Sequence, residues 1–256
     1  MTIKLVNEVR ENKPLIHNLT NQVVMNFSAN GLLAFGGSPI MAMAVEDAAD
    51  IARLSDGVLI NIGTLTEQHL QAMILAGKAA NEKGIPVVID PVGVGASEFR
   101  TEAFKRIINE VKPAAIKGNL GEMAHIIGVS VETKGVDSVG EGNEEEVAKK
   151  VSEQFDTLAL ITGKTDVISD GSEVIRNETG HEWLGRITGS GCLLGSILAA
   201  CLSTSGSPLD QAHAAVRFYG LAAEKAARHR NVNGPGTFAA RFIDALSMDL
   251  TKVEEA

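Results

Sequence analysis

Val58-Leu59-Ile60-Asn61-Ile62-Gly63 is one of four short apolar runs that end in small, polar or proline residues. The other three are Pro86-Val87-Val88-Ile89-Asp90-Pro91, Ala114-Ala115-Ile116-Lys117-Gly118 and Leu158-Ala159-Leu160-Ile161-Thr162-Gly163. Helical patterns separate these runs, over residues 67–83, 101–110 and about 119–127. The runs are apolar throughout instead of alternating, which is typical of parallel strands covered by helices on both faces. The sequence therefore predicts an α/β fold.

The pattern changes after Gly163. Residues 167–169 and 172–176 flank Asp170-Gly171 and predict a β-hairpin. A third short strand is expected at 183–187, helices are expected at 209–230 and 237–250, and the acidic stretch 140–146 is expected to begin a surface helix. We expect one domain over residues 1–256, with a mainly parallel central sheet, a short antiparallel extension and helices on both faces.

Composition and charge limit the kinds of molecule that this protein is expected to bind. The 256 residues carry a formal net charge of −9 without a run of lysine and arginine, which argues against nucleic acid or an anionic membrane as the main partner. No stretch is apolar for long enough to span a bilayer, and the N-terminus lacks the pattern of a signal peptide. Cys192 and Cys201 are expected on one helix, about 13 Å apart along its axis, which is too far for a disulfide. Two free thiols indicate the cytoplasm.

The turn Thr188-Gly189-Ser190-Gly191-Cys192 precedes a nearly all-apolar helical stretch and is the strongest candidate site. The first amides of a helix lack internal partners, and glycine lets an anion approach them closely. The helix dipole adds partial positive charge there, so we expect it to favour the thiolate of Cys192. The alternative is an ordinary glycine turn between a strand and a helix.

Polar residues or glycine follow every expected parallel strand. Ligands of such sheets lie beyond the carboxyl ends of the strands, where Asn61, Asp90, Lys117 and Thr162 are found. Asp90 is expected either to hold magnesium through water or to cap a turn. Lys117 and Glu122 suit phosphate oxygens and a metal or its waters, which phosphoryl transfer requires. For Glu122 the alternative is a surface residue of an N-capped helix.

Other chemistries have weaker support. The chain contains no Gly-x-x-x-x-Gly-Lys-Ser/Thr motif, and the Gly189 turn has Leu194 where a dinucleotide-binding fingerprint needs its third glycine. Glu122 and His125 form a single Glu-x-x-His motif, whereas a carboxylate-bridged di-iron site needs two. His17 is a candidate pocket residue.

Several motifs together resemble the hydroxyethylthiazole kinase family nearly from end to end. They are Leu15-Ile16-His17-Asn18-Leu19-Thr20-Asn21, Asn30-Gly31-Leu32-Leu33, Gly37-Ser38-Pro39-Ile40-Met41-Ala42, Leu59-Ile60-Asn61-Ile62-Gly63-Thr64-Leu65, Asp90-Pro91-Val92-Gly93, Lys117-Gly118-Asn119-x-x-Glu122, Ile161-Thr162-Gly163, Gly189-Ser190-Gly191-Cys192 and Gly234-Pro235-Gly236-Thr237-Phe238. The resemblance implies a ribokinase-like fold and phosphorylation of the alcohol of 4-methyl-5-(2-hydroxyethyl)thiazole with ATP and Mg2+ for thiamine salvage. It also implies a homotrimer with active sites between subunits.

The resemblance also implies roles for individual residues. Cys192 stands where most ribokinase-like enzymes have an aspartate base, and it would assist catalysis within an anion hole made with Gly189, Ser190 and Gly191. Ser190 replaces a commoner alanine or threonine. Lys117 stands where relatives often have arginine, which preserves the charge but not the bidentate fork. The implied ligand contacts are Lys117 and Thr162 for ATP, Met41, Gly189 and Asn21 for the thiazole, and Asp90 and Glu122 for magnesium.

Three alternatives remain at this stage. A hydroxymethylpyrimidine kinase of the same fold begins with a strand and a glycine/serine-rich loop, whereas residues 3–10 here predict a helix. A hydro-lyase acting on hydrated nicotinamide cofactors usually has aspartate at the position of Cys192. A non-catalytic nucleotide sensor would leave the combination of Asp90, Glu122 and Cys192 without a reason.

Overall fold

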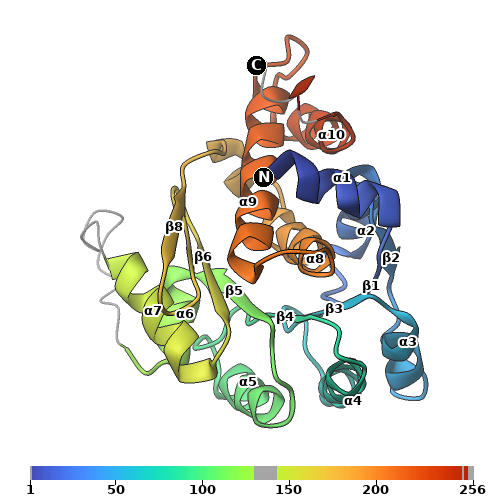
Figure 1. Ribbon diagram of the computed structural model, residues 1–256, viewed down its shortest axis with the longest axis vertical. Coiled ribbons are helices and arrows are strands. Elements are labelled where there is room, and N and C mark those ends of the chain that lie inside the picture. The colour runs from blue at the N-terminus through green and yellow to red at the C-terminus, as the bar shows by residue number, and fades with distance from the viewer. Residues whose placement is uncertain (1, 130–142, 250, 253–256) are drawn as a thin grey trace.

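One sheet of eight strands organises the computed structural model, which describes residues 2–129, 143–249 and 251–252 (Figure 1). The strand order is β2-β1-β3-β4-β5-β6-β7-β8. The strands are β1 (Leu15–Leu19), β2 (Ser38–Ile40), β3 (Gly57–Asn61), β4 (Val87–Asp90), β5 (Ala115–Asn119), β6 (Leu158–Thr162), β7 (Asp166–Ser169) and β8 (Val174–Asn177).

The sheet is parallel from β2 to β6 and antiparallel from β6 to β8. The predicted parallel sheet with an antiparallel extension is therefore confirmed. The register pairs Asn61 with Asp90 and Asn119 with Thr162, so the carboxyl ends of β3 to β6 lie at one edge of the sheet. All five residues of β3 and all four of β4 are buried, as expected of strands covered on both faces.

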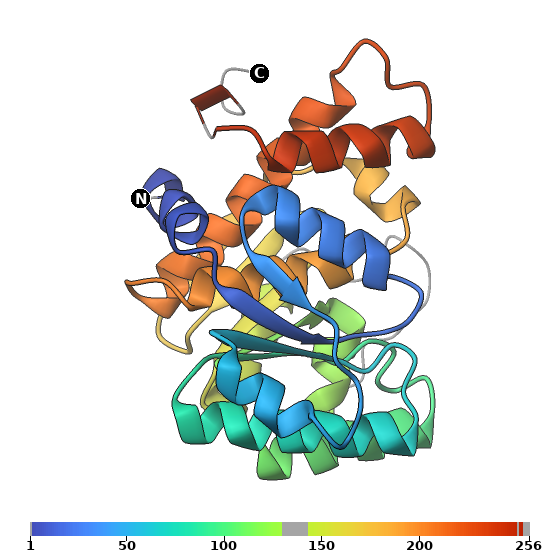
Figure 2. The ribbon, with the colours of Figure 1, turned by 90° about the vertical axis from the view of Figure 1, so that its right-hand side faces the viewer.

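Helices cover both faces of the sheet, as predicted (Figure 2). On one face α1, α2, α8, α9 and α10 pack around a core that includes Leu59, Val88 and Leu160. On the other face α3 to α7 pack around Val58, Ile60 and Ile89. The helices are α1 (Thr2–Asn12), α2 (Met25–Phe35), α3 (Ala48–Leu54), α4 (Glu67–Lys83), α5 (Glu98–Glu110), α6 (Leu120–Ile126), α7 (Asn143–Phe155), α8 (Ser190–Leu202), α9 (Pro208–Ala227) and α10 (Pro235–Leu246), with a 3₁₀ helix η1 at Glu182–Arg186.

Local capping explains where the helices begin and end. The Thr66 side chain accepts the N–H of His69 at the start of α4, and Gly84 ends that helix in the left-handed conformation. Both ends of α4 agree with the prediction. Helix α5 begins at Glu98, three residues before the predicted start, because the Ser97 side chain caps it by accepting the N–H of Arg100.

Helices α9 and α10 end at Ala227 and Leu246, three and four residues before the predicted ends at 230 and 250. Three further elements differ from the predictions in kind. The strand expected at 183–187 is wrong, because these residues form the 3₁₀ turn η1, capped where His181 Nδ1 accepts the N–H of Trp183. Strands β1 and β2 were not predicted. The acidic stretch does lead into α7, although residues 140–142 lie outside the described residues. Within the ranges that the structure describes, no helix combines the length and apolar character needed to cross a membrane.

Candidate active site

Polar side chains from several strands meet at the carboxyl edge of the parallel sheet. Asn61, Asp90 and Thr162 are the last residues of β3, β4 and β6, while Lys117 lies within β5. Helix α8 packs against β1, β3 and β4, and its first turn carries Cys192 to this edge. Strand order and one buried helix therefore gather residues that are more than 100 positions apart.

The turn before α8 is held in place from three directions. Gly189 has a φ of 95°, and a Cβ there would lie 2.9 Å from Val24 Cγ1, so glycine is required by both conformation and space. Ser190 Oγ donates to Leu184 O at 2.7 Å, and Tyr219 Oη donates to Ser190 O at 2.6 Å. The predicted glycine turn at the start of a buried helix is confirmed, and no side chain caps its first amides.

A chain of hydrogen bonds surrounds the Cys192 sulfur. Asn21 Nδ2 and Asn61 Nδ2 each donate to Cys192 Sγ at 3.3 Å. Asn61 Nδ2 also donates to Asp90 Oδ2 at 2.8 Å, and Lys117 Nζ donates to the same oxygen at 3.0 Å. Asn21, Asn61, Asp90 and Lys117 are all buried. Four of the residues that the sequence singled out therefore form one network with Asn61 at its centre.

The network determines the charge states. Burial raises the pKa of Asp90, against the opposing effects of Lys117 and Asn61. Burial lowers the pKa of Lys117, but Asp90, Cys192 and Glu122 together raise it above its ordinary value, so Lys117 is cationic. Burial and then Asp90 raise the pKa of Cys192, and Lys117 and the two asparagine amides offset this only in part. The raised pKa contradicts the expected thiolate at Cys192, because burial and the carboxylate of Asp90 favour the neutral thiol.

Glu122 belongs to the cap of α6. Its Oε2 accepts the N–H of Asn119 at 2.9 Å while Asn119 Oδ1 accepts the N–H of Glu122, which makes a capping box. Its Oε1 accepts the N–H of Gly93 at 2.8 Å. Both carboxylate oxygens therefore have backbone donors, and the cap anticipated as the alternative for Glu122 exists.

The oxygen donors at this edge fit a hard cation such as Mg2+. Asp90 Oδ1 is buried and has no hydrogen-bond partner among the residues that the structure describes, and Glu122 lies near enough to raise the Asp90 pKa. A magnesium ion usually keeps several waters and takes only one or two carboxylates. Among the described residues no three His, Cys, Asp or Glu side chains cluster as a metal cage. His125 Nε2 lies 3.2 Å from Thr101 Oγ1.

A cavity of about 700 Å³ lies beside the α8 turn. Its lining includes Thr162 and Gly163 at the end of β6, Ser190 and Gly191 of the turn, and Tyr219 of α9. Lys117 Nζ lies 3.5 Å from the position that a Cβ on Gly191 would occupy. A buried cation therefore lies close to Gly191, which lines a cavity of the size that small ligands occupy.

Met41 lies farther from this network. It follows the edge strand β2, which β1 separates from β3, and it is half-buried. His17 on β1 anchors the same loop, because its buried Nε2 lies 2.8 Å from Ala42 O. Burial lowers the pKa of His17. His17 is thus a packed residue of the sheet that fixes the loop carrying Met41.

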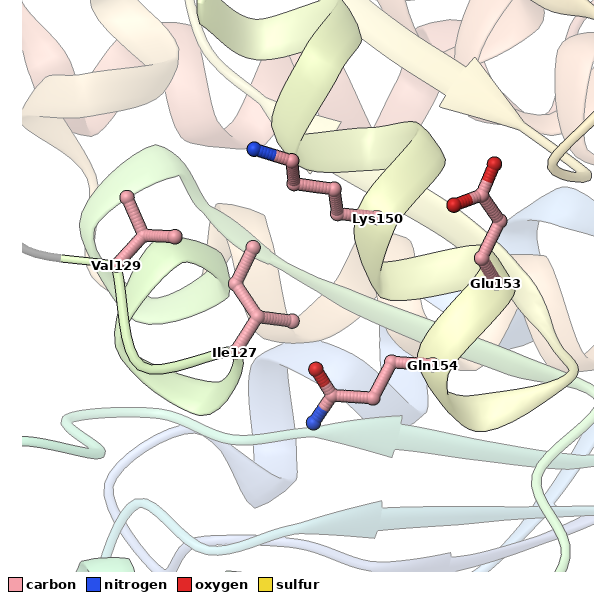
Figure 3. A pocket seen from close by; sticks show the side chains of 5 residues that line it. All are labelled: Ile127, Val129, Lys150, Glu153 and Gln154. Atoms are coloured by element: carbon pink, nitrogen blue, oxygen red, sulfur yellow. The ribbon is translucent and has the colours of Figure 1, made fainter.

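A second cavity, of about 320 Å³, lies between α6 and α7 (Figure 3). Its lining consists of Ile127, Val129, Lys150, Glu153 and Gln154. None of the predicted site residues lines it. The cavity beside α8 is the candidate active site, because Thr162, Ser190 and Gly191 line that cavity.

Comparison with known proteins identifies the family. A family model described as the hydroxyethylthiazole kinase family matches residues 6–252. The chain belongs to this family. Hydroxyethylthiazole kinase 1 from Oceanobacillus iheyensis is 56% identical to it over 247 residues, which cover 96% of each protein. A hydroxyethylthiazole kinase structure from Pyrococcus horikoshii is 39% identical, covers 96% of this chain and 92% of its own, and superposes with a TM-score of 0.88.

More distant structures confirm the fold. A ribokinase-like superfamily protein from Enterococcus faecalis shares 12% identity with a TM-score of 0.68, and covers 100% of this chain and 95% of its own. A Bacillus subtilis pyridoxal kinase in complex with ADP shares 19% identity with a TM-score of 0.62, and covers 82% of this chain and 91% of its own. The predicted ribokinase-like α/β fold and hydroxyethylthiazole kinase family are therefore confirmed.

Two residues of this member of the hydroxyethylthiazole kinase family were assigned no role from the sequence, although Asn61 was placed at a strand end where ligands are expected. Asn61 makes four hydrogen bonds at the centre of the network, and Tyr219 fixes the α8 turn. The signal for Asn61 was an asparagine at the end of an apolar run, two residues before Gly63. Tyr219 had no such signal, because it lies within the long helix α9, far from any motif.

Proposed function

We propose that this chain transfers the γ-phosphoryl group of ATP to the hydroxyl of 4-methyl-5-(2-hydroxyethyl)thiazole and thereby supplies thiazole phosphate for thiamine salvage. The observation that carries the proposal is membership of the hydroxyethylthiazole kinase family, at 56% identity to a named relative over nearly the whole chain. The buried cation of Lys117 beside the uncapped turn of α8 supports an anionic ligand at this position.

The proposed reaction assigns a role to Cys192, to Lys117 and to the backbone amides at the start of α8. The substrate hydroxyl would lie near Cys192 and form the new P–O bond while the bond from the γ-phosphorus to the leaving ADP breaks, and the proton of the hydroxyl passes to water. Lys117 and the amides of residues 189–192 would stabilise charge on the transferring group. Because phosphoryl transfer is loose, positioning and electrostatics dominate over a strong base. A neutral Cys192 suits an assisting role.

ATP and Mg2+ are the proposed cofactors. Thr162 lines the cavity in which the nucleotide would lie. Asp90, through its unpartnered Oδ1, and Glu122 would hold the ion or its waters. The ion, when bound, would neutralise charge on the phosphates.

The proposed assembly is a homotrimer of single-domain subunits, with active sites between subunits. Met41 and Asn21 belong to the proposed thiazole contacts. Exposed apolar side chains support a subunit contact near Met41, because Val23 and Leu33 are 70% and 57% exposed and α2 packs against β2. The need for ATP and the two free thiols support a cytoplasmic location. The mass of the particle in solution tests the trimer.

The first experiment compares hydroxyethylthiazole with hydroxymethylpyrimidine as substrates, with ATP and Mg2+ present. ATP consumption is followed, and the mass of each product is recorded. A thiazole product heavier by one phosphoryl group supports the proposal. Turnover of the pyrimidine alone would contradict the thiazole assignment, whereas ATP binding without turnover of either alcohol would favour a nucleotide sensor.

A further inference from the structure

Asn61 uses its whole hydrogen-bonding capacity at the junction of three strands and one helix. Its Oδ1 accepts the N–H of Gly63 at 3.0 Å and Nδ2 of Asn21 at 3.1 Å. Its Nδ2 donates to Asp90 Oδ2 at 2.8 Å and to Cys192 Sγ at 3.3 Å. A side-chain amide has two donors and two acceptor positions. Asn61, which is 1% exposed, therefore has no polar group left for a ligand.

The orientation of this amide is dictated by its neighbours. The backbone N–H of Gly63 is only a donor, so it requires the oxygen of Asn61 on its side. Asp90 Oδ2 already accepts from Lys117 Nζ at 3.0 Å, so it requires the amide nitrogen on the other side. With Asn61 fixed in this way, Asn21 must present its own nitrogen to Asn61 Oδ1.

This orientation has a consequence for each reactive group. Asn61 and Lys117 both bind Oδ2 of Asp90, so Oδ1 is the oxygen without a partner. The Cys192 sulfur accepts one N–H from Asn61 and one from Asn21, so its own proton must point away from both amides. One amide group thus sets which carboxylate oxygen and which side of the thiol remain available to a ligand.

We propose that Asn61 is a positioning residue for phosphoryl transfer, which acts by orienting the carboxylate of Asp90 and the sulfur of Cys192 without touching substrate. The inference rests on the proposed kinase function, and it adds a role for a residue that only touches other site residues. It predicts that loss of the Asn61 amide lowers kcat and leaves the binding of ATP nearly intact, because Asn61 does not line the nucleotide cavity.

Two variants test this role. Asn61→Ala removes all four hydrogen bonds, and Asn61→Asp preserves the volume and Oδ1 while it replaces both N–H donors by a carboxyl oxygen next to Asp90. We expect kcat to fall about 10- to 100-fold, which is the loss from misplacing reacting groups, with the KM for ATP within about threefold of wild type. A fall in kcat and in kcat/KM together marks an interaction needed in the transition state.

Asn18→Ala is the matched control. Asn18 is also a fully buried asparagine of the sheet, and its Oδ1 accepts the hydroxyl of Ser196 on α8 at 2.6 Å. It therefore ties the sheet to the same helix about one turn beyond Cys192, outside the network. We expect Asn18→Ala to lower stability as Asn61→Ala does, while kcat stays within about threefold of wild type.

The rate of Cys192 alkylation by iodoacetamide at a fixed pH gives a readout that does not depend on the kinase reaction. Loss of an amide donor should slow it roughly 10-fold, since a hydrogen bond to a charged group is worth about 1.5 kcal/mol and about 1.36 kcal/mol is a factor of ten. Asn18→Ala should leave the rate unchanged. Alkylation measures the reactivity of the thiol itself and does not require turnover. The comparison between variants is therefore still informative if the wild-type protein does not phosphorylate thiazole, a result that would reject only the proposed function.

The rates of catalysis and alkylation distinguish a positioning role of Asn61 from a general effect of the buried polar network. A selective loss of kcat and slower alkylation in both Asn61 variants, with Asn18→Ala unaffected, supports the positioning role. Equal losses of kcat in the Asn61 and Asn18 variants would show a general effect of a buried polar network and would overturn the proposal. Unchanged alkylation in folded Asn61→Asp would overturn it as well. If Asn61→Ala fails to fold, the Asp variant carries the test.

Discussion

The buried ion pair between Lys117 and Asp90 offers the sharpest test of how this site is built. Lys117→Met removes the ammonium group and preserves most of the length of the side chain. The Lys117 Nζ to Asp90 Oδ2 distance is 3.0 Å, and the two side chains are only 5% and 1% exposed. Removing one partner of a buried pair costs about 3–5 kcal/mol, because the other charge remains buried.

The cost should depend on pH. Burial already raises the pKa of Asp90, and loss of Lys117 removes the main opposing effect, so the folded-state pKa rises further. A carboxyl whose pKa is higher in the folded state binds a proton more tightly when folded. Stability is then greatest below the unfolded-state pKa of about 3.9 and falls as pH rises through the folded-state value. Lys117→Met should therefore be least stable, relative to wild type, at pH 8.

Urea unfolding at pH 5 and pH 8 measures this effect. The only tryptophan, Trp183, packs against Phe238 with ring centroids 5.7 Å apart and reports the transition, with far-ultraviolet circular dichroism as a second probe. The double variant Lys117→Met/Asp90→Asn should recover most of the loss and lose the pH dependence. A loss below about 1 kcal/mol at pH 8, or the same loss at both pH values, would refute a buried ionised pair.

Three further predictions concern the α8 turn. Cys192→Ala should lower kcat by less than the ~10²-fold that loss of a general base typically costs, because the thiol is neutral at rest; a far larger loss in folded protein would contradict this. Gly189→Ala should lower the free energy of unfolding by about 1–2 kcal/mol, because alanine is strained in the left-handed conformation, and by more because its Cβ would contact Val24. A lower midpoint of urea unfolding would show this effect, and an unchanged midpoint would contradict it. Native protein at pH 8 should take one iodoacetamide label, at Cys192, since burial raises the pKa of Cys201 to about 12; mass spectrometry before and after urea checks it, and a native label on Cys201 would contradict it.

The parts of the fold that were predicted from sequence are those with a local pattern. Strands β3 to β6 are buried apolar runs, and the ends of α4 are marked by Thr66 and Gly84. Strand β1 was missed because it contains His17 and Asn18, whose polar side chains usually indicate a loop. Both are fully buried, and Asn18 is satisfied by Ile16 O and the Ser196 hydroxyl, which lies 178 positions away. Only tertiary contacts allow this strand.

The candidate site divides in the same way. The α8 turn, Asp90 and Lys117 are marked by their positions at the ends of strands or at the start of a helix. The protonation state of Cys192 cannot be predicted from such a position, because it depends on the carboxylate that the fold brings near the thiol. Asn61 and Cys192 are 131 positions apart, so no spacing in the sequence predicts their hydrogen bond.

The buried polar groups of the site contribute little to the stability of the fold, and this favours a functional explanation of the Lys117–Asp90 ion pair. A buried ion pair is often no more stable than well-packed apolar residues of similar volume, and Asp90 Oδ1 adds a buried acceptor without a partner. The double variant Asp90→Leu/Lys117→Met should therefore be at least as stable as the double variant with Asn at position 90, although it has lost the Lys117 cation for phosphate and the Asp90 carboxylate for magnesium. Stability alone gives no reason for these residues, whereas an anionic ligand with its metal would use both the cation and the free oxygen.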